Sequence, residues 1–113
     1  MVTVTKKSDT FHFQVEGFHK IWALKNQLII SAENIVSAYQ DVSELQGWKG
    51  WRMPGTHVPY LITAGTYYKN GDRVFWDVMD KENAIIIQLK EEKYQKIIIE
   101  VENPAAVLQL LQE

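Results

Sequence analysis

The sequence predicts a mostly β domain that ends in one short α-helix. Two observations carry this prediction. Short runs rich in β-branched and aromatic residues alternate with polar or Gly-containing breaks, as in an antiparallel meander. After Pro104, apolar residues instead recur at helical spacing. The length of 113 residues fits one domain, and a hydrophobic fraction of 46% is enough to build its core. We expect residues 1–10 to be a mobile N-terminus and residues 11–113 to be the domain.

The first half of the domain predicts four strands joined by short connections. Phe11, Phe13 and Val15 alternate with polar residues, so they should face the core of a half-buried first strand. Gly17 offers a tight turn, after which the chain should return with His19 opposite Gln14. The predicted strands of this half span residues 11–16, 19–24, 28–31 and 35–39.

Residues 41–59 form the longest irregular stretch, and it holds the candidate binding residues: Trp48, Trp51, Arg52 and His57. Trp and Arg are typical of binding hot spots, and Arg can bond a carboxylate in a planar fork. The alternative is structural: the two Trp side chains fold inward to close the gap between two sheets, with Arg52 tied to a nearby acid. General burial preferences favour this second interpretation.

The second half predicts strands that end in a helix. The Asn70-Gly71 pair is a strong indicator of a two-residue hairpin. The last strand should face Ile97, Ile99 and Val101 inward. The predicted strands of this half span residues 60–68, 73–79, 84–89 and 95–101. Asn103 is a good N-cap for a helix from Pro104 to about Gln112 that must dock on the sheet.

The strand after the Asn-Gly turn alternates clearly. Val74, Trp76 and Val78 should lie on one face, with Phe75 and Asp77 on the other. We expect Asp77 to face Arg73 along the exposed side of this strand.

Several segments together resemble a small stand-alone family of bacterial pleckstrin-homology-like (PH-like) domains. The similarity extends from Phe11 to the C-terminus. The segments that carry it are residues 28–38, 52–56, 64–67, 75–78 and 99–104. The resemblance implies a roll or barrel of two antiparallel sheets, with about seven or eight strands, capped by the C-terminal helix. The family has no established biochemical activity, so the resemblance implies a binding role without naming a substrate.

Composition argues against several classes of partner. The net charge is −2 and no basic block occurs, so we expect no nucleic-acid binding. The first predicted hairpin, residues 15–20, lacks the cluster of cations that phosphoinositides require, so we expect no lipid headgroup or membrane binding. The absence of cysteine excludes disulfides and thiol chemistry. No apolar run approaches the length of a membrane span, and we expect a cytoplasmic protein.

No residue pattern predicts catalysis, a metal or a cofactor. None of the serines sits in a nucleophile elbow, and His12 and His19 are better explained as surface residues than as ligands. We therefore expect a non-catalytic module for protein–protein association or self-assembly, through a sheet edge or residues 47–59, with a homo-oligomer as one form. The alternative is a small-ligand binder with an aromatic-lined pocket near that stretch.

Overall fold

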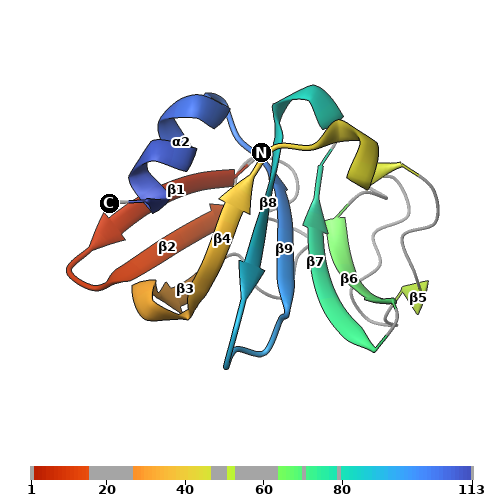
Figure 1. Ribbon diagram of the computed structural model, residues 1–113, viewed down its shortest axis with the longest axis horizontal. Coiled ribbons are helices and arrows are strands. Elements are labelled where there is room, and N and C mark those ends of the chain that lie inside the picture. The colour runs from red at the N-terminus through yellow and green to blue at the C-terminus, as the bar shows by residue number, and fades with distance from the viewer. Residues whose placement is uncertain are drawn as a thin grey trace.

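The computed structural model describes residues 2–15, 27–46, 51–52, 64–69, 71–78 and 80–112, which form two β-sheets and a C-terminal α-helix (Figure 1). The first sheet has the strand order β1-β2-β3 and the second the order β4-β8-β9-β7-β6-β5. The strands are β1 (Val2–Lys7), β2 (Thr10–Val15), β3 (Gln27–Ser31), β4 (Ile35–Tyr39), β5 (Trp51–Arg52), β6 (Ala64–Lys69), β7 (Asp72–Asp77), β8 (Ala84–Leu89) and β9 (Lys96–Glu100). The helices are α2 (Pro104–Leu111) and the 3-10 turns η1 (Ala32–Asn34), η2 (Val42–Leu45) and η3 (Lys81–Asn83). The predicted mostly β architecture with a C-terminal helix is confirmed.

The first sheet begins earlier in the chain than the sequence analysis placed it. Strand β1 lies within the segment expected to be a mobile N-terminus, and it pairs with β2 from Val2 opposite Val15 to Lys7 opposite Thr10. Its alternation of Val and Thr explains the pairing, because Val2 is only 2% exposed and Val4 is half-buried beside it.

The partner predicted for β2 is also different. Gln14 lies opposite Thr3 of β1 on one side and Gln27 of β3 on the other. Both neighbours of β2 are therefore taken, and the predicted pairing of Gln14 with His19 is wrong. The return strand predicted at residues 19–24 lies outside the described residues.

The second sheet is mixed, which corrects the expectation of two purely antiparallel sheets. Strand β8 pairs antiparallel with β4 on one side and with β9 on the other. Strand β9 therefore lies between β8 and β7, and it runs parallel to β7, with Trp76 opposite Ile98. In the described strands neither sheet closes on itself, since β4 and β5 end the second sheet. The predicted barrel closure is thus not found there.

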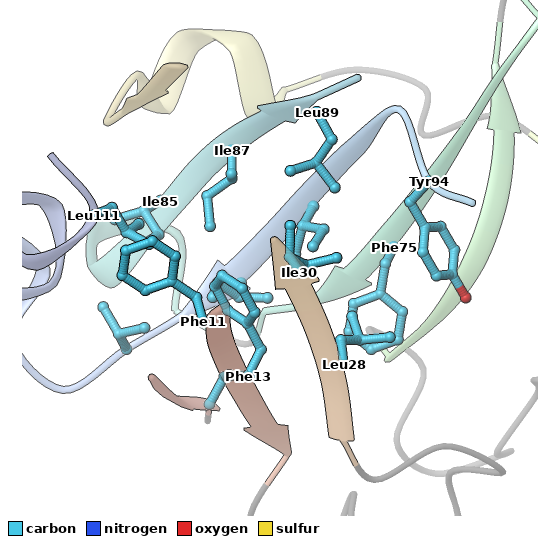
Figure 2. Packing of buried hydrophobic residues seen from close by; sticks show 14 residues of the cluster. Phe11, Phe13, Leu28, Ile30, Phe75, Ile85, Ile87, Leu89, Tyr94 and Leu111 are labelled. Carbon is cyan, nitrogen blue, oxygen red and sulfur yellow. The ribbon is translucent and has the colours of Figure 1, made fainter. Parts of the chain in front are cut away.

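The main core fills the space between the two sheets and under α2. Figure 2 shows Phe11 and Phe13 of β2 and Ile30 of β3 pointing toward Ile85 and Ile87 of β8. The remaining buried members are Val2, Leu28, Phe75, Leu89, Tyr94, Ile97, Ile99, Val101 and Leu111. Ile97, Ile99 and Val101 are therefore buried, as predicted.

The opposite face of the six-stranded sheet carries a second core. It consists of Leu45, Tyr67, Val74, Trp76, Val78, Ala84, Ile86 and Ile98. Because Ile86 and Ile98 alternate with residues of the main core, strands β8 and β9 are buried on both faces. This explains their continuous runs of Ile, which are typical of strands covered on both sides.

Two local predictions are confirmed in detail. The β6–β7 hairpin places Lys69 opposite Asp72, and Gly71 has φ +86°, a backbone conformation that glycine adopts without strain. Helix α2 begins where the cap predicts, because the Asn103 side chain accepts a hydrogen bond of 3.2 Å from the Ala106 N–H. Leu111 near its end packs against the main core beside Ile85 (Figure 2).

Candidate functional site

Half of the candidate binding residues can be placed. Trp51 and Arg52 form β5 at the edge of the six-stranded sheet, where Trp51 pairs with Tyr68 and Arg52 with Tyr67 of β6. Trp48 and His57 lie outside the described residues. The aromatic-lined pocket predicted near residues 47–59 therefore stays a prediction, as does the alternative that both Trp side chains close the core.

Asp77 contradicts the prediction made for it. Its side chain is 0% exposed, whereas the sequence analysis expected it on an exposed face beside Arg73. Arg73 instead donates a hydrogen bond of 3.1 Å from Nε to the Tyr68 hydroxyl and lies over that ring. The prediction assigned the side chains of β7 to the correct two faces, but both faces are buried. The carboxyl group of Asp77 is therefore buried on the face that it shares with Phe75.

A chain of polar contacts crosses one end of the second core. The Ser37 hydroxyl donates to the Gln88 side chain at 3.0 Å, and the Tyr39 hydroxyl donates to Glu44 at 2.9 Å. Lys96 Nζ lies 3.1 Å from the same Glu44 carboxylate. Burial, together with the hydrogen bond to Glu44 and its charge, raises the pKa of Tyr39 to about 12.

These contacts have a structural function. Glu44 belongs to η2, and the two groups that hold it lie on β4 and β9, so they fix this turn against the sheet. Leu45, the next residue, is thereby placed in the second core. Asp41 caps the same turn, since its carboxylate accepts from the backbone N–H groups of Ser43, at 3.1 Å, and Glu44. A further hydrogen bond of 2.6 Å from the Ser43 hydroxyl is the main reason that the pKa of Asp41 is lowered. Partly exposed ion pairs of this kind contribute little stability on their own.

Four described strands have a neighbour on one side only, and they differ in how they resist pairing with another chain. Edge strands are commonly protected by charge, by a bulge or by being very short. Strand β1 carries exposed Lys6 and Lys7. Strand β4 has an irregular register between Ile35 and Ser37, so it is bulged. Each of these two edges therefore has a protective feature, whereas β5 is described at Trp51 and Arg52 alone and is not compared.

Strand β3 has none of these features. Its sequence, Gln27 to Ser31, contains no charged residue and no proline, and its pairing with β2 is regular over all five residues. Leu28 and Ile30 face the main core, whereas Ile29 points outward and is 56% exposed. An uncharged, regular edge with an exposed apolar side chain is the type of edge that accepts another strand.

Two other large hydrophobic side chains are exposed among the described residues. Val36 at the bulge of β4 is 58% exposed, and Val42 of η2 is also exposed. The sequence does not identify Ile29 or Val36 as exposed, because their apolar runs have no period that would indicate an outward face. The register with β2 supplies that information for Ile29, which lies opposite His12 on the outer side of the sheet.

The same described ranges hold no group of three or more His, Cys, Asp or Glu side chains that could bind a metal ion. His12 is half-buried, rather than a fully exposed surface residue, and its Nε2 lies 3.2 Å from the Thr10 hydroxyl. No helix in the described part of the chain is long and apolar enough to cross a membrane.

Comparison with known proteins finds no matching family model, no matching curated protein and no matching solved structure.

Proposed function

We propose that this chain is a non-catalytic interaction module that associates with another protein strand, from a second copy or from a partner, at the edge of β3 that has no neighbour among the described strands. The observation that carries the proposal is the combination of an uncharged, unbulged edge with the 56% exposed side chain of Ile29. Added strands gain affinity from main-chain hydrogen bonds and specificity from alternate side chains.

The distribution of burial supports an edge as the contact. Both faces of the six-stranded sheet carry packed cores, and the inner face of the three-stranded sheet is covered by the same main core. Of the described sheet surfaces, the edges and the outer side of the first sheet are left for a partner. Among the edges of β1, β3 and β4, that of β3 has no described feature that opposes pairing.

The PH-like relationship is part of this proposal. The order of many strands followed by a C-terminal helix supports it, as does the packing of α2 against the main core. The parallel pairing of β7 with β9 is a departure from the antiparallel sheets that the resemblance implies. A binding role for such a domain, without catalysis, agrees with the proposal, and so does a cytoplasmic location.

The test is the association state of the protein, measured by light scattering from micromolar to millimolar concentration, together with capture of partners from the source cell. We expect either a mass above that of one chain or a captured protein. Ile29→Lys should weaken that association by at least about tenfold, because a lysine on an edge strand opposes the addition of another strand and the apolar contact of Ile29 with that strand is lost.

Val36→Lys is the matched control, because Val36 is equally exposed but lies on the bulged edge of β4. Neither substitution touches a core, so circular dichroism and thermal unfolding should stay as in the wild type. Association that survives Ile29→Lys, or that both variants weaken equally, would rule out the β3 edge. A strict monomer that captures no protein would rule out the interaction module altogether.

A further inference from the structure

We draw no further inference here: the strongest candidate, the outer face of the three-stranded sheet around the exposed Ile29 and its neighbour His12, is an apolar and polar surface for which nothing in the described part of the chain shows what covers it.

Discussion

Replacing Ile98 with alanine tests whether the six-stranded sheet is a core on both faces. Ile98 of β9 is 4% exposed and lies between Trp76 of β7 and Ile86 of β8 in the register. The substitution removes three carbons, and each buried carbon contributes about 0.8 kcal/mol, which gives about 2.4 kcal/mol. The space left behind adds to this loss, so we expect the free energy of unfolding to fall by about 3 kcal/mol.

The measurement is urea unfolding followed by circular dichroism, with the loss taken from the midpoint at an unchanged slope. Ile29→Ala is the control, because the same three carbons are removed at a position that is 56% exposed. Its cost should stay within about 0.5 kcal/mol, as at most surface sites. If Ile98→Ala proved as mild as Ile29→Ala, the second face would not be a packed core and the reasoning would fail.

A double-mutant cycle makes the test more specific. Ile86 and Ile98 lie directly opposite each other on β8 and β9 and belong to the same core. Truncating both to alanine should give a loss that differs from the sum of the single losses by about 0.5 kcal/mol or more. Strict additivity would show that the two side chains do not pack together.

Three further predictions concern local contacts. Asn103→Ala should lower the free energy of unfolding by about 1 kcal/mol, measured by urea, because it removes the cap on the Ala106 N–H. Gly71→Ala should cost about 1–2 kcal/mol in the same assay, through backbone strain alone, because an added Cβ at φ +86° would meet no atom within 4 Å. In a tyrosinate absorbance titration, Glu44→Gln should lower the pKa of Tyr39 from about 12, with Tyr39→Phe identifying the band. Since folding raises the pKa of Tyr39, its protonated hydroxyl stabilises the fold below the ordinary tyrosine pKa, and this contribution is lost as the pH rises toward 12. An equal fall in the free energy of unfolding at alkaline pH in the wild type and in Tyr39→Phe would contradict this prediction.

The parts of the fold that the sequence predicts well are those determined by neighbouring residues. The hairpin at Gly71 and the Asn103 cap depend on the chemistry of one or two residues, and both are found where predicted. Strand pairing depends on residues far apart in the chain. No local pattern indicates that β8 pairs with β4 or that β9, rather than β8, is the neighbour of β7.

Burial on both faces explains the errors on individual strands. A period of two sorts side chains into two faces but does not say that one face is exposed. On β7 the sorting is correct, yet the face expected to be exposed holds the wholly buried Asp77. On β9 the prediction named Ile97 and Ile99 as buried and gave no environment to Ile98, which packs in the second core.

At the candidate site the error is the reverse, because here an exposed side chain has the sequence pattern of a buried one. The sequence pattern favours large aromatic and cationic residues as the site, and of these Trp51 and Arg52 lie on the edge strand β5. Ile29 gives no such signal, because an Ile flanked by Leu and Ile is typical of a core position. The exposure of Ile29 follows from the pairing of β3 with β2, which turns Leu28 and Ile30 inward and leaves one large side chain outside.

That exposure is best understood by comparing the edges of the two sheets. Natural edge strands avoid unwanted pairing by carrying charge or by bulging, and β1 and β4 do so at Lys6, Lys7 and the Ile35–Ser37 irregularity. Among its described residues β3 carries neither a charge nor a bulge, and Ile29 is 56% exposed. If the proposed strand association takes place at this edge, a charged residue at position 29 is the substitution that should oppose it.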